Sequence, residues 1–270
     1  MPAGQVNGAK INYELAGNAK ARVLVLSNSL GTNFFMWDAQ LPALQENFRV
    51  LRYDTRGHGQ SEVTHGPYSF EQLGRDVLAL ADSLEIDTFV FCGLSMGGVI
   101  GMWLGINAPD RVQKLVLCST AAKIGNADTW NARIAALRKG GAKSISAGTM
   151  ERWFTARFRE RHPQTVERIR HMVESTSAEG YIACCEALRE ADFREPIAQI
   201  RTPTLVISGT HDPATTPQDG RFIAARIPGA RFVELDAAHI LNIEQQERFT
   251  KEVSQFCSSP ESAKGSGQSM

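Results

Sequence analysis

The chain has 270 residues, and its 29 basic and 29 acidic side chains cancel to a formal charge of zero. Nucleic-acid binding draws most of its affinity from phosphate neutralisation and usually leaves a basic excess, so the balanced charge argues against a nucleic-acid partner. The composition, 43% hydrophobic and 21% charged, is typical of a globular protein. The length predicts one large domain, or one domain that carries an insertion.

Five scattered cysteines predict neither a disulfide framework nor a metal site. They form no CxxC pair and no Cys/His spacing typical of zinc ligands. Residues 1–17 lack a basic segment followed by an apolar one, so we expect no signal peptide. The sequence therefore predicts reduced thiols, no bound metal and a cytoplasmic location.

Short apolar, β-branched runs recur along the chain, with turns or helical stretches between them. We expect strands at residues 10–15, 23–26, 49–53, 88–92, 114–118, 204–208 and 231–235. Helical spacing of apolar residues predicts helices at 70–84 and 222–227. This alternation predicts an α/β protein with a mostly parallel sheet.

The strand pattern stops between about residues 122 and 195. This stretch contains helix-like segments at 130–137, 150–159, 165–173 and 179–191. We therefore predict a helical cap at 122–195, inserted into a core made of residues 1–121 and 196–257. Residues 258–270 are rich in Ser and Gly and are expected to form a disordered tail.

One apolar run tests whether the chain enters a membrane. Residues 89–106 contain a single hydroxyl, that of Ser95, and glycines at positions 93, 97, 101 and 105 would suit helix pairing in a bilayer. However, the run opens as a buried strand, breaks at a glycine, and lacks basic and aromatic anchors on both flanks. We expect a strand and a buried helix whose glycines allow close approach to the sheet, and no membrane insertion.

A GxSxG pentapeptide, Gly93-Leu94-Ser95-Met96-Gly97, directly follows the strand at 88–92. Such a pentapeptide arises by chance in roughly one chain in ten of this length, so the motif alone carries little weight. A nucleophile elbow, however, requires a strand before it, a helix after it, and glycines where side chains would collide, and all three are expected here. We predict that Ser95 is a nucleophile; the alternative is a packing turn with a buried hydroxyl.

A serine hydroxyl becomes a good nucleophile only when a base takes its proton and an acid orients that base. Of the histidines after Ser95 we choose His239, which sits just past a predicted strand, whereas His171 lies in the helical insertion. Asp212 follows the strand at 204–208 and precedes a proline that stiffens its turn. The order Ser95, Asp212, His239 predicts a catalytic triad; the alternatives are a surface histidine and a turn or helix-cap aspartate.

The oxyanion formed by attack of Ser95 needs two fixed backbone donors. One is expected at Met96, at the positive end of the following helix. For the other we choose Leu30, in the loop that follows the strand at 23–26. The alternative for this loop is an ordinary strand-to-helix turn.

Together with the elbow, Asp212 and His239, one further segment makes the chain similar to the α/β-hydrolase superfamily over residues 1 to about 257. That segment is Asp54-Thr55-Arg56-Gly57-His58-Gly59-Gln60-Ser61. The resemblance implies a mostly parallel eight-stranded sheet flanked by helices, with a cap inserted between strands. It implies a mainly structural role for residues 54–61, so we assign no catalytic role to His58.

Three segments resemble the 3-oxoadipate enol-lactonases in particular: residues 28–32, residues 93–98, and residues 119–125 with 130–133. Asn28-Ser29 departs from the His-Gly that is more frequent in the superfamily, but is similar to this subgroup. The resemblance implies opening of an enol-lactone in bacterial aromatic catabolism (the β-ketoadipate pathway) through an acyl-enzyme, without metal or organic cofactor.

The predicted cap is locally basic. Residues 131–171 carry ten Lys or Arg and three Glu, an excess of seven positive charges in a neutral chain. The lactone implied by the resemblance is a small anion, so a basic cap would attract it and one guanidinium could pair with its carboxylate. We choose Arg133 for that pairing and Trp130 as a wall of the pocket; the alternatives are a solvated helix face for Arg133 and cap core for Trp130.

Other functions fit the same scaffold. A carboxylesterase, a C–C bond hydrolase or a perhydrolase would use the same triad, because a fold does not fix a substrate. A hydrolase-like receptor for a small ligand would retain the triad mainly for binding and would turn over slowly. The sequence leaves the oligomeric state open.

Overall fold

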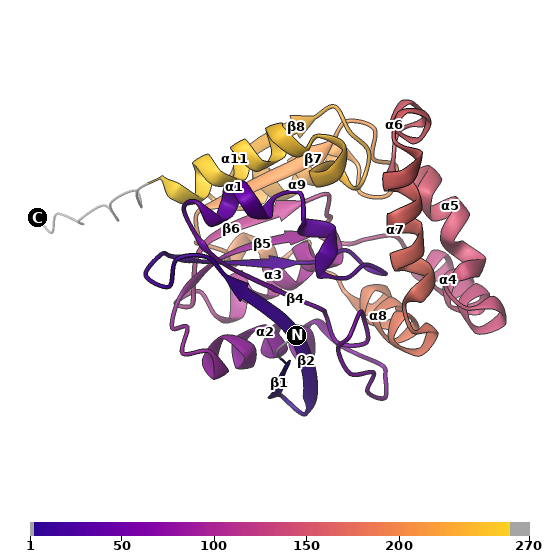
Figure 1. Ribbon diagram of the computed structural model, residues 1–270, viewed down its shortest axis with the longest axis horizontal. Helices are drawn as coiled ribbons and strands as arrows, with labels where there is room; N and C mark the ends of the chain where they lie inside the picture. The colour runs from indigo at the N-terminus through magenta and orange to yellow at the C-terminus, as the bar shows by residue number, and fades with distance from the viewer. Residues whose placement is uncertain (1–2, 260–270) are drawn as a thin grey trace, which may run out of the picture.

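The computed structural model describes residues 3–259, in which a single sheet is flanked by helices and a second group of helices gathers at one end (Figure 1). The described strands are β1 (Ala3–Val6), β2 (Ala9–Ala16), β3 (Val23–Ser27), β4 (Arg49–Tyr53), β5 (Phe89–Leu94), β6 (Val112–Cys118), β7 (Thr204–Gly209) and β8 (Arg231–Leu235). Within that range the sheet has eight strands in the order β1-β2-β4-β3-β5-β6-β7-β8. β2 pairs antiparallel with β1 and β4, and all the other pairs are parallel. The α/β class and the mostly parallel eight-stranded sheet are thereby confirmed.

Every strand expected from an apolar run is present, and β1 is the one that the pattern missed. Its four residues, Ala3–Val6, include a glycine and a glutamine, and only Val6 is buried. β1 lies at the sheet edge and pairs only with β2. An edge strand with one buried side chain leaves almost no hydrophobic signal in a sequence.

Helices cover both faces of the sheet. Outside the cap they are η1 (Phe34–Trp37), α1 (Leu41–Gln45), α2 (Phe70–Ser83), α3 (Met96–Asn107), η2 (Pro196–Gln199), α9 (Pro217–Arg226), α10 (Leu241–Glu244) and α11 (Gln246–Ser258). On β6 the Lys114 ammonium donates to the Phe256 carbonyl at the end of α11, whereas the neighbouring Leu115 faces α3. Because side chains alternate along a strand, α11 and α3 lie on opposite faces.

The glycines of α3 serve close packing. A Cβ atom on Gly101 would lie 3.0 Å from Leu115 and 3.1 Å from Phe91, so a side chain there would push the helix off the sheet. Among the described residues no helix is long and apolar enough to cross a membrane. The run at 89–106 is therefore a buried strand and helix, as expected.

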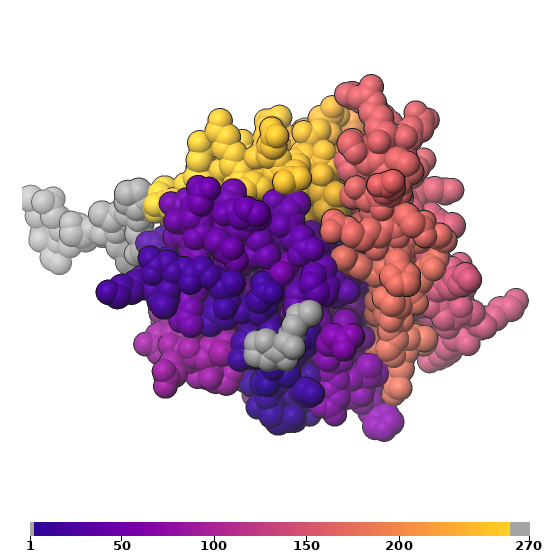
Figure 2. All heavy atoms as spheres, in the orientation of Figure 1, coloured from indigo at the N-terminus to yellow at the C-terminus, as the bar shows by residue number. Residues whose placement is uncertain are grey.

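Between β6 and η2 lie the helices of the cap, α4 (Ala127–Gly140), α5 (Lys143–Trp153), α6 (Ala156–Arg161), α7 (Pro163–Ser175) and α8 (Ala178–Glu190). Their spheres pack directly against the core in Figure 2. The prediction of a single helix at 150–159 is wrong. The chain becomes extended at Phe154, and α6 begins after Thr155. Thr155 donates its backbone N–H and its hydroxyl to Glu244 of α10, a contact that stops α5 from continuing.

The C-terminal boundary also differs slightly from the expected one. Helix α11 runs to Ser258, and the Ser259 carbonyl accepts a hydrogen bond from Lys114. Ser258 and Ser259 therefore belong to the packed structure and not to the tail that was expected from residue 258. The rest of that expected tail, residues 260–270, lies outside the described residues.

Candidate active site

Ser95 occupies a strained turn between β5 and α3. Its backbone has φ 58° and ψ −113°, values that a residue with a side chain rarely adopts. The turn is fixed on both sides of the peptide: Ser95 N–H donates to the Cys118 carbonyl at 2.8 Å, and Thr120 Oγ1 donates to the Ser95 carbonyl at 2.9 Å. This is the geometry of a nucleophile elbow, in which strain holds the hydroxyl at the end of the strand.

The two outer glycines of the pentapeptide are required by close approach. A Cβ atom on Gly93 would lie 2.1 Å from the Gly97 carbonyl oxygen, and one on Gly97 would lie 2.4 Å from the Ser27 carbonyl oxygen. Real Cβ atoms do not approach backbone oxygens that closely, so any side chain would force the elbow apart. The GxSxG spacing therefore reflects packing of the elbow on itself and on β3.

Asp212 and His239 are joined at the same edge of the sheet. Asp212 follows β7 and His239 follows β8, and these strands are parallel neighbours. His239 Nδ1 lies 2.7 Å from Asp212 Oδ2, and both residues are 3% exposed. Thr215 Oγ1 donates to the same carboxylate oxygen at 2.7 Å, which fixes the carboxylate plane. The pair predicted from the sequence therefore exists as a buried hydrogen bond.

The environment keeps the Asp212 carboxylate charged. Burial by itself raises its pKa, but the charge and hydrogen bond of His239 and the hydrogen bonds from Thr215 outweigh burial and lower the pKa below its usual value. A charged Asp212 requires a proton on His239 Nδ1. The remaining ring nitrogen, Nε2, is therefore free to take a proton from another group.

The Ser95 hydroxyl itself has no hydrogen-bond partner among residues 3–259, although Ser95 is only 7% exposed. The structure thus unites Asp212 and His239 directly, and it brings Ser95 to the same sheet edge without a hydrogen bond to His239. Catalytic hydrogen bonds are often long in ligand-free enzymes and tighten when substrate binds.

Neither of the two predicted oxyanion donors has a hydrogen-bond acceptor within the described part of the chain. Neither Leu30 N–H nor Met96 N–H donates to a protein group there, whereas the N–H groups that follow each of them are taken. Gly31 N–H donates to His58 Nε2 at 2.9 Å, and Gly97 N–H donates to the Asn28 carbonyl at 3.1 Å. This pattern favours Leu30 and Met96 over their neighbours as donors to a ligand.

Trp153 was not identified from the sequence, yet it contacts His239. The two rings stack with centroids 5.9 Å apart and an interplanar angle of 28°, and Ile240 N–H donates to the Trp153 carbonyl at 3.1 Å. Trp153 is the last residue of α5, so the cap lies directly over the histidine. In the sequence Trp153 appears only as one apolar residue of a helix, and nothing there indicates this contact.

Trp130 and Arg133 lie together on α4. Trp130 is buried, and its indole N–H donates to the Ile124 carbonyl at 2.7 Å. The Arg133 guanidinium lies 5.2 Å from the centre of the Trp130 ring, within cation–π range. Arg133 forms no ion pair among the described residues, so its charge is available to an anion.

Arg152 and Tyr181 join Arg133 in a group that the sequence did not indicate. Burial lowers the pKa of Arg152, and the positive charge of nearby Arg133 lowers it further. Burial also raises the pKa of Tyr181 to about 12, opposed by Arg133 and Arg152. The Tyr181 hydroxyl is buried without a hydrogen-bond partner within residues 3–259, and Arg152 has no ion pair there. The charge of Glu151 opposes the lowering of the Arg152 pKa but forms no ion pair with it. Two arginines and one unsatisfied hydroxyl therefore gather without an ion-paired carboxylate among the described residues.

Several other cap cations do have carboxylate partners. They are Arg138 with Glu186, Arg168 with Asp38, and Arg170 with Glu167 and Glu174. These pairs involve three of the ten cations counted from the sequence. No group of three or more His, Cys, Asp or Glu that could hold a metal ion occurs among the described residues.

Comparison with known proteins agrees with the fold. A family model described as the alpha/beta hydrolase fold matches residues 22–246, and the chain is an α/β-hydrolase. It is 46% identical to 3-oxoadipate enol-lactonase 2 of Acinetobacter baylyi over 243 residues, which cover 90% of this chain and 91% of that one. The chain therefore belongs to the 3-oxoadipate enol-lactonase family.

Solved structures agree with this assignment. The crystal structure of the enol-lactonase from Burkholderia xenovorans LB400 superposes with a TM-score of 0.94 at 48% identity, covering 96% of this chain and all of that one. A malate-bound thermophilic esterase from Thermogutta terrifontis has a TM-score of 0.90 at 27% identity, covering 95% of this chain and 98% of that one. The same scaffold therefore occurs in enzymes named for different substrates.

Proposed function

We propose that this chain hydrolyses 3-oxoadipate enol-lactone to 3-oxoadipate through an acyl-enzyme formed on Ser95. The enol-lactonase names of its relatives support the substrate. The observation that carries the chemistry is the buried hydrogen bond of 2.7 Å between His239 and Asp212, at the sheet edge where Ser95 sits in a strained elbow. Because all five cysteines are free and buried, we place the enzyme in the reducing cytoplasm.

In the first half-reaction His239 Nε2 takes the proton of Ser95 Oγ while that oxygen attacks the lactone carbonyl. The negative charge that develops on the carbonyl oxygen is held by Leu30 N–H and Met96 N–H. The C–O bond of the ring then breaks, and its electron pair goes to the enol oxygen. His239 returns the proton to that oxygen, and the enol tautomerises to the ketone.

In the second half-reaction water attacks the acyl-enzyme. His239 takes one proton from the water, the same two amides hold the second oxyanion, and Ser95 leaves as the proton returns to its oxygen. The product is a dicarboxylate. The Asp212 carboxylate stabilises the imidazolium that forms in each half-reaction and keeps the proton on Nδ1.

Arg133 and Arg152 are proposed to bind the free carboxylate of the lactone. Neither has an ion pair among residues 3–259, and they lie close enough for Arg133 to lower the pKa of Arg152. An anion between them would relieve their repulsion and could accept a hydrogen bond from the Tyr181 hydroxyl. Trp130 would support Arg133 from one side by the cation–π contact and form a wall of the pocket.

The test of the activity is steady-state hydrolysis of 3-oxoadipate enol-lactone beside neutral p-nitrophenyl acetate, with wild type and Ser95→Ala in parallel. We expect a lactone kcat/KM several orders of magnitude above that of the ester, lost in Ser95→Ala. A preference for the ester would indicate a general esterase, and turnover slower than about one per second for both would favour a receptor.

The test of the carboxylate site compares Arg133→Met and Arg152→Met with Arg138→Met. Arg138 is an exposed cap arginine that pairs with Glu186, so it controls for the loss of one positive charge. A charge-assisted hydrogen bond contributes about 1.5–3 kcal/mol, which predicts a 10- to 100-fold loss of kcat/KM for the lactone and little change for the neutral ester. Equal losses on both substrates would exclude these arginines from carboxylate binding.

A further inference from the structure

The turn that carries Leu30 is held by side chains from distant parts of the chain. Gly31 has φ +81°, and its N–H donates to His58 Nε2 at 2.9 Å. Thr176 Oγ1 lies 3.1 Å from the Gly31 carbonyl and 3.0 Å from the Met172 carbonyl, so these two oxygens share its one proton. The Tyr181 ring fills the space that a Cβ atom on Gly31 would occupy. Both polar groups of Gly31 are therefore fixed by residues far from it in sequence.

This arrangement determines which amide of the turn is available to a ligand. The peptide bond between Leu30 and Gly31 is planar, so the direction of Gly31 N–H also fixes the direction of the Leu30 carbonyl. Leu30 N–H lies in the preceding peptide plane, whose Ser29 carbonyl accepts Thr32 N–H at 3.1 Å and Thr32 Oγ1 at 2.7 Å. The φ and ψ of Leu30 join the two planes, so holding Gly31 N–H fixes one of the two planes that determine the backbone of Leu30. Of the amides in this turn, Leu30 N–H is the one without a partner in the described part of the chain. The imidazole that holds Gly31 thus acts on the oxyanion donor one residue away.

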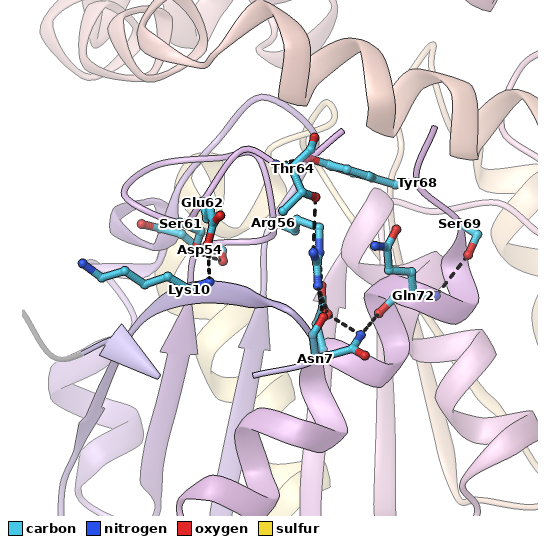
Figure 3. Close-up of polar contacts among 11 residues, drawn as sticks. Asn7, Lys10, Asp54, Arg56, Ser61, Glu62, Thr64, Tyr68, Ser69 and Gln72 are labelled. Atoms are coloured by element: carbon cyan, nitrogen blue, oxygen red, sulfur yellow. Dashed lines mark hydrogen bonds and ion pairs between the residues drawn. The ribbon is translucent and has the colours of Figure 1, made fainter. Parts of the chain in front are cut away.

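His58 is itself rigidly placed. It is 1% exposed, and its Nδ1 lies 3.3 Å from the Arg56 carbonyl. The Arg56 guanidinium donates to the two Asp76 carboxylate oxygens at 2.6 Å and 2.8 Å. It also donates to the Asn7 carbonyl and to the Thr64 hydroxyl, and Figure 3 labels Arg56, Asn7 and Thr64. Because Nε2 accepts from Gly31, the network assigns the single ring proton to Nδ1, directed at the Arg56 carbonyl.

We propose that His58 is a positioning residue of the oxyanion hole, whose Nε2 lone pair accepts Gly31 N–H and thereby aims Leu30 N–H at the developing oxyanion. This role rests on the proposed function, because it presumes that Leu30 donates to the tetrahedral intermediate. It differs from catalysis by His58, because the ring nitrogens of His58 contact Gly31 and Arg56 and not Ser95.

The surroundings of His58 keep its ring neutral. Burial lowers the pKa of His58 to about 4, opposed by the hydrogen bond to the Arg56 carbonyl. The groups that face the ring are Gly31 N–H, the Arg56 carbonyl and the Tyr181 ring. The centroids of the His58 and Tyr181 rings lie 6.1 Å apart. None of them is a carboxylate that would stabilise a charged imidazolium. The acceptor lone pair on Nε2 therefore persists at neutral pH.

The experiment compares His58→Gln with His58→Asn. A glutamine amide reaches about as far as Nε2 and can accept Gly31 N–H, whereas an asparagine amide reaches only as far as Nδ1 and can donate to the Arg56 carbonyl. Because a lost oxyanion donor costs about 10²- to 10³-fold in kcat, we expect Asn to lower kcat by about 100-fold with KM changed less than about threefold. We expect Gln to retain at least about a tenth of the wild-type kcat.

A tetrahedral mimic separates positioning from general disruption. 2,2,2-Trifluoroacetophenone forms a hemiketal with an active serine and places its oxyanion in the hole, so its affinity should fall in His58→Asn by about the same factor as kcat. Equal losses in the Asn and Gln variants, or a loss confined to KM, would overturn the proposal. Circular dichroism and the thermal midpoint of both variants check that each is folded.

A measurement on wild type decides the case even where the variants do not fold. Nitrogen-15 NMR of labelled histidine distinguishes the two tautomers and the charged ring, and His58 is expected as the Nδ1-protonated neutral form at pH 7. A ring protonated on Nε2, or charged at pH 7, would overturn the proposal. Because the ketone and p-nitrophenyl acetate need no lactone, failure of the lactonase assignment leaves these readouts intact and is recognised separately by the lactone assay.

Discussion

The elbow at Ser95 and the turn at Leu30 face the same sheet edge, but they are held in different ways. The elbow is fixed by its own glycines, by the neighbouring Cys118 carbonyl on β6 and by Thr120 just beyond it. The turn at Leu30 is fixed by His58 from the loop after β4 and by Thr176 from the cap. Thr120 and His58 are similarly distant in sequence from the residues they hold, 25 and 27 positions, whereas Thr176 is 145 positions from Gly31. The Ser95 half of the candidate oxyanion hole is therefore held within the core, and the Leu30 half depends on the cap as well.

The cap is connected to the candidate site through the Leu30 turn. Thr176 and Tyr181 both belong to the cap region, and both contact Gly31. A displacement of the cap would therefore change the Leu30 turn, whereas the Ser95 elbow, held by the core, would keep its geometry. We expect changes in the cap to affect the Leu30 turn more than the Ser95 elbow, whose partners Cys118 and Thr120 belong to the core.

The largest effect is expected for Ser95→Ala. In serine hydrolases removal of the nucleophile lowers kcat by about 10⁶-fold, and the residual rate comes from binding and the oxyanion hole. The Ser95 hydroxyl has no hydrogen-bond partner among the described residues, so the thermal midpoint should change by no more than a few degrees. Steady-state assays and calorimetry measure the two quantities, and a variant with wild-type turnover would disprove the nucleophile.

Asp212→Asn is expected to rank second, with a loss of about 10⁴-fold in kcat. The amide preserves the shape of the carboxylate but favours the wrong tautomer of His239, so the base loses its orientation. The Asp212 pKa lies below its usual value, so acid should protonate this carboxyl only well below neutral pH.

The matched control is Asp236→Asn, which alters an exposed aspartate that pairs with His211 and should leave kcat unchanged. Similar losses in both variants would contradict the triad.

Gly93→Ala tests the self-contained packing of the elbow. The added methyl group would lie 2.1 Å from the Gly97 carbonyl oxygen, a backbone atom that cannot move aside cheaply. Overpacking of this kind costs about 1–3 kcal/mol or more, so the unfolding midpoint in urea should fall clearly. Gly4→Ala is the control, since its methyl group would meet its nearest neighbour, Val6, at 3.6 Å, an ordinary contact. Equal stability of the two variants would refute the packing argument.

Most of the fold could be predicted from the sequence because its strands are buried on both faces. β3, β5 and β7 are buried at every position and therefore appear as continuous apolar runs. The break between α5 and α6 could not be predicted, because Thr155 is pulled out of the helix by Glu244, a partner 89 positions away. Local propensity carries no information about such a partner.

The candidate site divides in the same way. Asp212 and His239 could be paired from the sequence, because each follows a strand and neighbouring parallel strands end at one edge. Arg152, Trp153 and Tyr181 could not be identified, because they come from helices whose orientation over the core leaves no trace in local sequence. Site residues that directly follow a strand could be predicted from the sequence. Site residues that lie on the cap helices could not.

Acidification should reveal the neutral state of His58. Its pKa is about 4 in the folded chain and about 6.5 in an unfolded one, so between these values the unfolded state binds more protons and stability falls as the pH is lowered. The contribution is fully present above pH 6.5 and is lost towards pH 4, by an amount on the order of 3 kcal/mol. The His58→Gln variant has no imidazole at this position, so its stability lacks this pH-dependent contribution.

Urea denaturation of wild type and His58→Gln at pH 7, 5.5 and 4 measures the effect. Other acid-sensitive groups, Asp212 among them, are common to both chains and cancel in the difference. The stability advantage of wild type over the variant should shrink steadily as the pH falls. A difference that stays constant from pH 7 to pH 4 would show that His58 is not held neutral by burial.

The smallest expected effect is that of Thr176→Val, which tests the cap's contact with the turn. Its hydroxyl has one proton, and Oγ1 lies 3.1 Å from the Gly31 carbonyl and 3.0 Å from the Met172 carbonyl. A single neutral hydrogen bond contributes about 0.5–1.5 kcal/mol, which corresponds to a three- to tenfold loss of kcat if the bond serves to hold the turn.

Thr250→Val is the matched control for this change. Thr250 is equally buried, and its hydroxyl donates to the Gln246 carbonyl one helical turn back in α11, away from the site. Both variants should lose similar stability, because each loses one buried hydroxyl that contacts a carbonyl four residues back, but only Thr176→Val should lose kcat. Combined with His58→Asn, Thr176→Val should cost less than the sum of the two separate losses, because both residues hold the same glycine. Strict additivity would mean that His58 and Thr176 act independently of each other, and that the cap does not position the Leu30 turn.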